Sequence, residues 1–502
     1  MGASPWTRCQ CLSVGGIEML IGSLLRHATE RPRDPALWVE HRWWCWQELL
    51  QAVLANADRL TGYPSGARFV TTFANDARAV VGALSLMVDG HVEVPLGDQH
   101  SAEHVQSVRS RSNAAAQLSC QDVGLAVAGD PNVGIKRLQR SLQDRRPDDD
   151  ALILWTSGTT ARPRGVVLSC GALFANASGK LDAVPQTPRQ RRLTVLPLWH
   201  SFARTCDLGT WLISGGALAV TLGWKGMLAS APAVQPQLVS VVPSLVKRML
   251  AAGGAELDAQ MRQWGLGQLQ ILACGGAALA AEDYRRLTAL GLCVIHGYGL
   301  TEAGPTICSA SPDTVRPGYV GRPIRDTQIR IDANGELWAR GPGLMTRYLD
   351  DPAATAAVLQ NGWLRTGDLA LQDADGMVRI LGRRDETIVC SNGLKLQPLE
   401  VEQMLQRSEA VQHAVLWQDD ADQLVAIIEP AQYAKPAVDV VQELESLAAQ
   451  LVSWKRPRRW AILSQPLAPE ERTAKGTPKR RIVGPRYAPT ATTFATGKAS
   501  PG

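Results

Sequence analysis

The chain has 502 residues, which is too long for one hydrophobic core and predicts two or more domains. Its composition, 45% hydrophobic and 20% charged, is typical of a soluble globular protein. The net charge of +5 is small for this length, so it favours anionic small molecules only weakly and gives no indication of a nucleic-acid partner. The ten cysteines include no Cys-x-x-Cys pair, which predicts reduced thiols in a cytoplasmic protein.

The two ends of the chain are predicted to carry no fold. Residues 1–16 have the composition of a flexible leader and lack a secretion signal. Residues 488–502 are rich in Ala, Thr, Pro and Gly, which predicts a disordered tail. No apolar run is long enough to span a membrane, and peripheral contact with a membrane is left open.

Between these ends, helical and strand patterns alternate. Apolar spacing predicts helices over residues 49–60 and 79–88, and strands over residues 68–73 and 92–96. The same alternation continues past residue 300. It predicts an α/β fold with layered, mostly parallel sheets covered by helices.

A hydroxyl- and glycine-rich loop, residues 156–165 (TSGTTARPRG), follows the apolar run 152–155 and precedes the run 166–168. Both runs are predicted strands. The loop can direct hydroxyl, amide and guanidinium donors to one point, and polyphosphate fits such a point because its oxygens only accept hydrogen bonds. It is not the Gly-Lys-Ser/Thr loop of P-loop proteins. The alternative is a solvated Ser/Thr turn.

This loop resembles the phosphate-binding signature of the adenylate-forming enzymes, which include acyl-CoA synthetases, luciferases and peptide-synthetase adenylation domains. Ala161 stands where the superfamily has glycine, and Arg164 where it has lysine. The resemblance covers roughly residues 17–487, and seven motifs in one order make coincidence negligible. The six further segments are residues 196–202 (LPLWHSF), 275–279 (GGAAL), 296–302 (HGYGLTE), 335–342 (GELWARGP), 362–369 (GWLRTGDL) and 382–402.

The resemblance implies two domains and a reaction. A large adenylation domain would span residues 17–383, and a small mobile α+β lid domain would span residues 384–487, with the hinge at Asp385. The reaction would form acyl-AMP from ATP and a carboxylic acid, and then pass the acyl group to the thiol of CoA, with Mg²⁺ bound. Residues 196–204 and 242–245 are most similar to long-chain fatty acyl-CoA synthetases, which implies a fatty acid.

The resemblance also assigns site residues. Glu302 would hold Mg²⁺, which prefers carboxylate oxygen, and Thr156 would share the ion. Asp368 would accept hydrogen bonds from both ribose hydroxyls, and Tyr298 would stack on adenine. The candidate catalytic residues are Thr301, Glu302, His200 and Lys479. The candidate residues for nucleotide or CoA are Thr156, Ser157, Gly158, Thr159, Thr160, Arg164, Gly165, Gly275, Gly276, Ala277, His296, Gly297, Tyr298, Asp368, Arg383 and Gly393.

The sharpest departure lies near the C-terminus. Residues 473–480 (TAKGTPKR) fit the pattern Thr-x-x-Gly-Lys-x-x-Arg and place Thr477 at the adenylation lysine. A threonine cannot supply the ammonium that neutralises charge developing at the α-phosphate. Lys475 and Lys479 flank this position. Two alternatives to an acid–CoA ligase therefore stay open, an acid–carrier-protein ligase that loads a phosphopantetheine arm on an acyl carrier protein, and a nucleotide- or acyl-binding pseudoenzyme.

Overall fold

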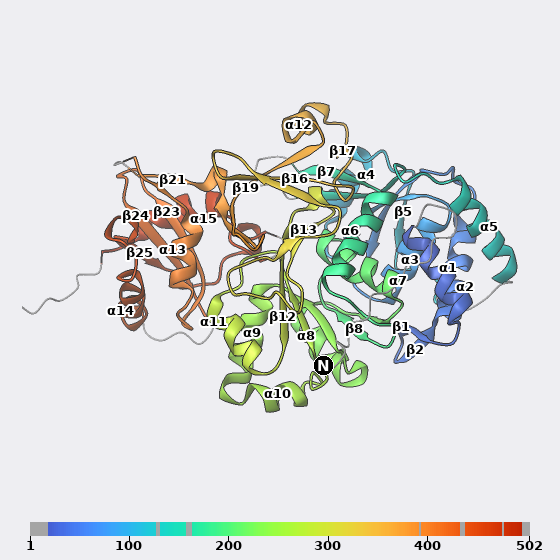
Figure 1. Ribbon diagram of the computed structural model, residues 1–502, viewed down its shortest axis with the longest axis horizontal. Coiled ribbons are helices and arrows are strands. Elements are labelled where there is room, and N and C mark those ends of the chain that lie inside the picture. Colours follow the sequence, from blue (N-terminus) through green and yellow to red (C-terminus); the bar gives the residue numbers. More distant parts are fainter. Residues whose placement is uncertain are drawn as a thin grey trace, which may run out of the picture.

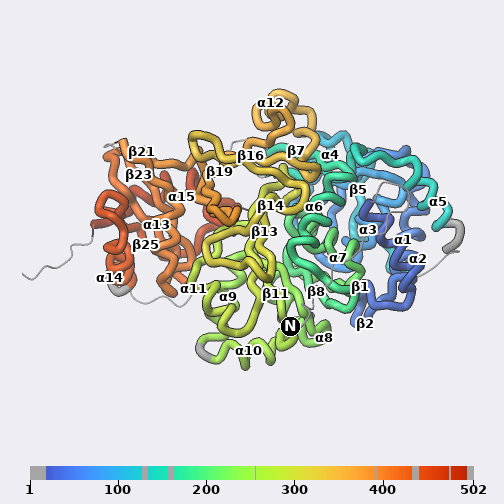
Figure 2. The backbone as a smooth tube through the Cα atoms, viewed as in Figure 1, coloured from blue at the N-terminus to red at the C-terminus, as the bar shows by residue number. Residues whose placement is uncertain are grey.

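The computed structural model describes residues 19–126, 131–156, 163–390, 393–431, 437–473 and 476–493, without the side chains of residues 131–133, 255 and 437–439. In Figure 1 the chain runs from a blue-to-cyan sheet on the right, through green and yellow sheets in the middle, to orange and red elements on the left. Figure 2 traces the same path and shows that the C-terminal residues form one end of the molecule.

The first sheet has, within the described residues, six strands with a parallel centre. Strands β5, β3, β4 and β6 are mutually parallel, whereas β7 and β17 run antiparallel at one edge. In spatial order the strands are β17 (Arg347–Tyr348), β7 (Arg164–Ser169), β6 (Asp150–Thr156), β4 (Val92–Gly97), β3 (Arg68–Phe73) and β5 (Ala116–Ser119).

The second sheet has nine strands in the part of the chain that the structure describes. Its five central strands are parallel, and their carboxyl ends therefore meet at one edge. In spatial order the strands are β14 (Arg322–Pro323), β13 (Thr306–Ser309), β12 (Cys293–Gly299), β11 (Ile271–Cys274), β10 (Leu238–Val241), β8 (Arg191–Thr194), β9 (Ala217–Val220), β1 (Pro35–Val39) and β2 (Arg42–Cys45).

A third, antiparallel sheet precedes the C-terminal elements. Its strands are β15 (Gln328–Ile331), β16 (Glu336–Arg340), β19 (Trp363–Gln372) and β18 (Leu359–Gln360), with β20 (Val378–Arg383) paired to β19. The C-terminal strands are the hairpin β21 (Ile388–Val389) and β22 (Lys395–Leu396), and the sheet β23 (Val411–Gln418), β24 (Leu424–Pro430) and β25 (Arg459–Ile462).

Helices cover these sheets. A π-helical segment (Ala203–Gly209) leads directly into α7, and no helix among the described residues is long and apolar enough to cross a membrane. The helices are α1 (Leu20–Glu30), α2 (Trp46–Ala57), α3 (Ala77–Val88), α4 (Ala102–Arg111), α5 (Pro131–Asp144), α6 (Cys170–Ala183), α7 (Thr210–Ser214), α8 (Gly223–Val234), α9 (Pro243–Gly253), α10 (Leu257–Gln263), α11 (Ala281–Ala289), α12 (Pro352–Val358), α13 (Pro398–Leu405), α14 (Ala437–Ala448) and α15 (Arg480–Tyr487).

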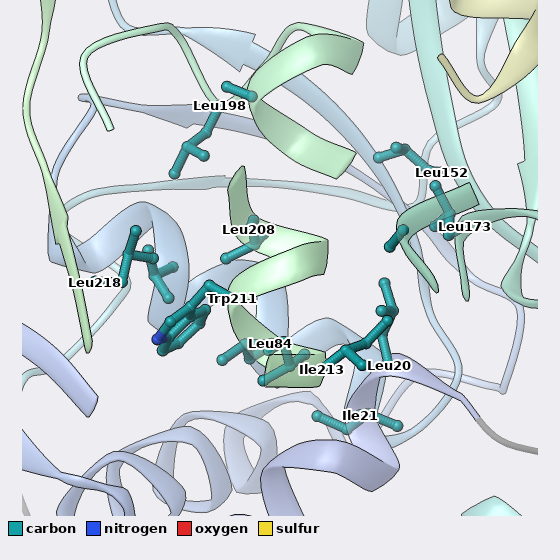
Figure 3. Close-up of a cluster of buried hydrophobic side chains, with 14 of the residues drawn as sticks. Leu20, Ile21, Leu84, Leu152, Leu173, Leu198, Leu208, Trp211, Ile213 and Leu218 are labelled. Carbon is teal, nitrogen blue, oxygen red and sulfur yellow. The ribbon is translucent and has the colours of Figure 1, made fainter. Parts of the chain in front are cut away.

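The largest hydrophobic core lies between the first two sheets. Trp46 from α2 stacks on Trp211 from α7 at 5.2 Å between ring centroids, and both rings are almost fully buried. Figure 3 shows leucine and isoleucine side chains of α1, α3 and α7 in the same cluster as Trp211, with Leu173 of α6 farther from the ring. The residues from Ile388 onward pack into separate clusters of their own. That separation supports the predicted lid domain, whose boundary stays a prediction.

The sequence predictions of local structure are confirmed where the pattern was strong. The predicted strands over residues 68–73 and 92–96 are β3 and β4, and the predicted helices are α2 and α3. The predicted disordered tail is wrong for its first residues, because Ala488 and Ala491 are buried and Thr492 pairs with Trp460 through backbone hydrogen bonds of 2.9 and 3.0 Å. Small apolar side chains, which suggest disorder by composition, here fill a gap beside β25.

Candidate functional site

The candidate site lies at the carboxyl edge of the nine-stranded sheet. Gly275 directly follows β11, and Thr301 follows β12 after one residue. Side chains that follow neighbouring parallel strands meet at one edge, where α/β proteins commonly bind ligands. The predicted segments 275–279 and 296–302 are thereby brought together although about twenty residues separate them in the chain.

A histidine of strand β12 bonds the two segments to each other. The His296 imidazole is buried, and its Nε2 donates to the Ala277 carbonyl oxygen at 3.2 Å. Burial lowers the pKa of His296, so the ring is neutral near neutral pH. At Gly275 a Cβ would lie 3.1 Å from the Phe202 ring, so glycine lets that ring pack against the strand end. Gly276 has φ +84°, a conformation that favours glycine.

Tyr298, Asp368 and Arg383 form a second cluster. The Tyr298 hydroxyl donates to Asp368 Oδ2 at 2.5 Å, and Arg383 Nη1 donates to Asp368 Oδ1 at 3.3 Å. Burial raises the pKa of Asp368, while the Arg383 guanidinium and the Tyr298 hydroxyl oppose that rise. Burial and the Asp368 carboxylate raise the pKa of Tyr298, which keeps its hydroxyl protonated.

This cluster fits a ribose. Each Asp368 oxygen accepts one hydrogen bond from the protein and retains a lone pair, so the carboxylate can accept two more bonds from a vicinal diol. Strand pairing sets Asp368 opposite Arg383 across β19 and β20, which explains how residues of two different motifs meet. The predictions that Asp368 binds the ribose and that Arg383 reaches the same ribose or a phosphate have this geometry in their favour and stay predictions.

Glu302 and the strands that flank the phosphate loop are joined by a tyrosine that sequence reasoning missed. The Tyr348 hydroxyl donates to Glu302 Oε1 at 2.8 Å. The Arg164 guanidinium lies over the Tyr348 ring, 5.4 Å from its centroid, and Arg164 Nε donates to Asp351 Oδ2 at 3.3 Å. The Thr156 hydroxyl donates to the Arg164 carbonyl oxygen at 3.4 Å. Burial and the Glu302 carboxylate raise the pKa of Tyr348, so it stays a donor to Glu302.

This grouping fits a magnesium ion bound by few protein ligands. No group of three or more His, Cys, Asp or Glu side chains that could hold a metal occurs in the described part of the chain. Mg²⁺ is usually held by one or two carboxylates together with substrate phosphates and waters. Glu302, which Tyr348 holds by a hydrogen bond, is a carboxylate of this kind.

The turn that carries Thr301 and Glu302 is held by hydrogen bonds to Asn176 of α6, a residue that sequence reasoning also missed. Asn176 Nδ2 donates to the carbonyl oxygens of Ala303 and Thr306 at 2.7 and 2.9 Å, and its Oδ1 accepts from the Thr306 amide at 3.1 Å. The Thr205 hydroxyl donates to the Gly304 carbonyl oxygen at 2.8 Å. The Asn176 side chain therefore makes three hydrogen bonds, and all three hold this one turn.

Thr301 and His200 lie on facing segments. The Thr301 hydroxyl is 3.3 Å from the Ser201 hydroxyl, which follows His200 in the chain. The 196–202 segment therefore contacts the Thr301 turn. His200 is partly exposed, and its ring lies 6.1 Å from that of Trp199.

Two predicted residues lie apart from these clusters. Lys479 precedes α15, and its Nζ donates to the Glu470 carbonyl oxygen at 3.1 Å within the C-terminal region. Gly393 lies in the turn of the β21–β22 hairpin with φ +77°, far from β12 in Figure 1. Ser157, Gly158, Thr159 and Thr160 lie outside the described residues, as does Lys475.

The loop that carries Thr477 approaches the carboxyl edge of the sheet. The Thr473 amide donates to the Thr477 carbonyl oxygen at 2.8 Å, and Arg472 Nη1 donates to the Gly476 carbonyl oxygen at 3.0 Å. A Cβ on Gly476 would lie 3.8 Å from the Ser244 hydroxyl, in the first turn of α9 directly after β10. The C-terminal region thus meets the site edge through this loop.

Comparison with known proteins identifies the family. The AMP-binding enzyme family matches residues 24–349, and the AMP-binding enzyme C-terminal domain matches residues 385–493. This protein belongs to the AMP-binding enzyme family. The predicted adenylate-forming superfamily and its α/β fold are thereby confirmed. The CoA ligases of this superfamily use ATP, Mg²⁺ and CoA.

Relatives of this AMP-binding enzyme are acid–CoA ligases with different substrates. Indoleacetate–CoA ligase of Aromatoleum aromaticum is 29% identical over 68% of this chain and 66% of that protein. Feruloyl-CoA synthase of Amycolatopsis sp is 27% identical over 86% and 92%, respectively. Long-chain-fatty-acid–CoA ligase of Yersinia pestis is 30% identical over 53% and 50%. In fold, the chain is similar to anthranilate CoA ligase in complex with anthranoyl-AMP, with a TM-score of 0.81 at 18% identity over 93% of this chain and 96% of that chain.

Proposed function

We propose that this AMP-binding enzyme is an ATP-dependent acid–CoA ligase that activates a fatty acid as acyl-AMP and transfers the acyl group to CoA. The observation that carries the proposal is that Tyr298, Thr301 and Glu302 lie on β12 and the turn after it, and that Asp368 of β19 accepts a hydrogen bond from Tyr298. One strand then positions both ends of a nucleotide. The fatty chain is the finer part of the proposal, supported by the similarity of residues 196–204 and 242–245 to long-chain ligases.

Acyl adenylation brings two anions together, the acid carboxylate and the α-phosphate of ATP, so the protein must position both and supply positive charge. Asp368 would hold the ribose, and the Thr301 hydroxyl would donate to the α-phosphate. Glu302 and Thr156 would hold Mg²⁺, which neutralises charge on the phosphate oxygens. Tyr348 and Asn176 act through these residues, because the first orients the Glu302 carboxylate and the second holds the turn.

The nucleotide assignment can be tested by Asp368→Ala. Loss of two hydrogen bonds to a charged acceptor should weaken ATP binding by about 2 to 4 kcal/mol, measured by calorimetry. Asp375→Ala, which removes an exposed carboxylate from the turn between β19 and β20, should leave ATP affinity unchanged. An unchanged ATP affinity in the Asp368 variant would contradict the ribose assignment.

The acid and the acceptor can be tested in one screen. Pyrophosphate release is measured with octanoate, palmitate, indoleacetate and ferulate, with and without CoA. The proposal expects the fatty acids to give the highest kcat/KM and CoA to be consumed with release of AMP. A preference for the aromatic acids contradicts the fatty part alone. Turnover only with a phosphopantetheinylated carrier protein contradicts CoA as the acceptor, and no release with any acid favours the binding-protein alternative.

A further inference from the structure

A cavity of about 310 Å³ lies at the amino ends of β3, β4 and β6. Its wall includes Arg68, Val92 and Asp150, which are the first residues of these three parallel strands. The candidate catalytic groups follow the opposite ends. Thr156 closes β6 six residues beyond Asp150, so about 20 Å of strand separates the cavity from the phosphate loop.

The cavity holds a buried cation without a carboxylate partner. Among the described residues, Arg145, Arg192 and Arg204 are the arginines that are at least nine-tenths buried. Arg192 pairs with Asp207, and Arg204 pairs with Glu93 at 2.8 Å. Arg145 has no carboxylate within ion-pair distance in the described structure: its Nη2 donates to the Met87 carbonyl oxygen at 2.6 Å, and the guanidinium also interacts with the Cys170 thiol. Buried charges are normally paired, so Arg145 has unused capacity for an anion.

The turn beside Arg145 is shaped to admit its guanidinium. Gly90 has φ +74°, and a Cβ there would lie 2.8 Å from Arg145 Nη2 and 2.9 Å from the Ser65 hydroxyl. Any side chain at position 90 would displace these groups. Glycine therefore keeps the guanidinium and the hydroxyl side by side at the cavity wall.

The other charged groups of the wall are already engaged. Asp150 accepts from both terminal nitrogens of Arg347, at 3.0 and 2.6 Å, and Asp149 Oδ2 accepts from the Arg146 amide at 2.8 Å. Arg68 Nη1 donates to the Ser112 carbonyl oxygen at 3.0 Å. The two aspartates make the surroundings unfavourable for a dianion such as phosphate, so a ligand with a single negative charge fits best.

The rest of the wall is apolar. It includes Met19, Leu20 and Ile21 at the start of α1, Met87 near the end of α3, and Leu173 of α6. Figure 3 shows Leu20, Ile21 and Leu173 at the edge of the main core. A ligand that fills this space needs a hydrocarbon body and one anionic end. The volume is about the smallest at which proteins enclose small ligands.

We propose that this cavity is a second small-molecule site, separate from the candidate site at the carboxyl edge of the nine-stranded sheet, which binds an aliphatic monocarboxylate with its carboxylate on Arg145. The chain of the acid lies among the methionine and leucine side chains. The site does not depend on the proposed ligase activity, because none of its residues belongs to the nucleotide cluster.

The test uses octanoate as the probe and the methionine methyl groups as local reporters. The protein is labelled with ¹³C at these methyls, and the Met19 and Met87 signals are identified from Met→Leu variants. Octanoate should shift both signals in a saturable way, while Met227 and Met249 of a different core cluster stay unmoved. Octanamide, which has the same chain without the charge, should bind at least tenfold more weakly.

Arg145→Gln should also weaken octanoate binding at least tenfold, and Arg146→Gln, which alters the exposed neighbouring arginine, should not. Thermal unfolding shows whether each variant is folded, and the octanamide comparison needs no variant at all. The proposal is overturned if millimolar octanoate leaves the Met19 and Met87 signals in place, if octanamide binds equally well, or if folded Arg145→Gln binds as wild type does. If octanoate acts as a substrate without moving the Met19 and Met87 signals, it binds only at the candidate functional site. That result also overturns the proposal.

Discussion

Two loops at the site edge are built in opposite ways. The turn from Thr301 to Thr306 is held by buried hydrogen bonds from Asn176 and Thr205, and it keeps the superfamily pattern. The loop from Thr473 to Thr477 lies in the C-terminal region, where Thr477 is exposed and stands at the position that the sequence pattern predicts for the adenylation lysine.

The difference shows where substitution is tolerated. Removing a partner from a buried hydrogen-bond network leaves unsatisfied polar groups, which costs about 1 to 3 kcal/mol each. Replacing lysine by threonine on an exposed loop leaves no buried polar group without a partner, so the stability of the fold should hardly change. The residues predicted to bind nucleotide and metal therefore include a turn held by buried hydrogen bonds, whereas Thr477 lies on an exposed loop.

The largest effect is expected from Glu302→Gln. A neutral amide is a poor magnesium ligand, so kcat should fall by about 10³-fold with little change in thermal stability. Glu256→Gln on an exposed turn is the matched control and should be fully active. Near wild-type turnover at saturating Mg²⁺ would remove Glu302 from the metal site.

Thr477→Lys tests the other loop directly. If threonine truly replaces the adenylation lysine, restoring an ammonium should speed acyl-AMP formation by about 10²-fold. Thioester formation from supplied acyl-AMP should change little. Rapid-quench measurement of pyrophosphate release gives the rate.

The competing explanation is that a flanking lysine already acts. In that case Lys479→Ala or Lys475→Ala should abolish adenylation and Thr477→Lys should do little. Lys479 Nζ contacts the Glu470 carbonyl oxygen in the present arrangement, so the first outcome is the expected one. If none of the three variants changes the rate, the alignment of residues 473–480 with the superfamily pattern is wrong.

The contribution of a buried polar group to stability can also be measured from the pH dependence of the free energy of unfolding. His27 of α1 is the group to test. Its Nε2 donates to the Leu212 carbonyl oxygen at 2.9 Å, its Nδ1 accepts from Arg31 at 2.6 Å, and burial lowers the His27 pKa to about 4. The unfolded chain therefore takes up a proton near pH 6.5 that the folded protein refuses until about pH 4.

Because of this, the free energy of unfolding should fall by about 3 kcal/mol as the pH drops through that window, and level off below it. Urea unfolding of the wild type and His27→Gln at several pH values isolates this contribution. Exposed His41→Gln is the control and should retain the wild-type pH profile. A pH dependence that His27→Gln leaves intact would contradict the assignment.

The smallest effect on catalysis is expected from Asn176→Leu. The variant keeps the volume and removes all three hydrogen bonds to the turn, so kcat should fall about tenfold and the Mg²⁺ concentration for half-maximal rate should rise. Asn176→Asp retains the acceptor for the Thr306 amide but sets a carboxylate oxygen against the carbonyl oxygens of Ala303 and Thr306, so it should impair the turn at least as much as Asn176→Leu. An unchanged Mg²⁺ requirement would show that the clamp is structural only.

Much of this molecule was determined by short stretches of its sequence. The alternation of apolar residues predicted β3, β4, α2 and α3, because burial on one face imposes a period that can be counted. Asp351 before Pro352 is a sequence pattern typical of a helix start, and the Asp351 carboxylate accepts from the Ala354 amide at 2.9 Å at the start of α12. The loop that starts at residue 156 and the segment that starts at residue 296 identified the family. A loop that binds a ligand through neighbouring residues needs particular residue types in a fixed order along the chain.

Tertiary structure alone decided the rest. Asn176, Tyr348 and Arg145 carry no motif, since each acts on a partner more than forty residues away that only sheet pairing and helix packing bring near. The order at Ala488 and Ala491 depends likewise on a hydrophobic gap beside β25, which composition cannot reveal. Local patterns record what a segment needs from its own neighbours in the chain, whereas a clamp, an unpaired buried cation or an ordered tail exists only once distant segments are packed together.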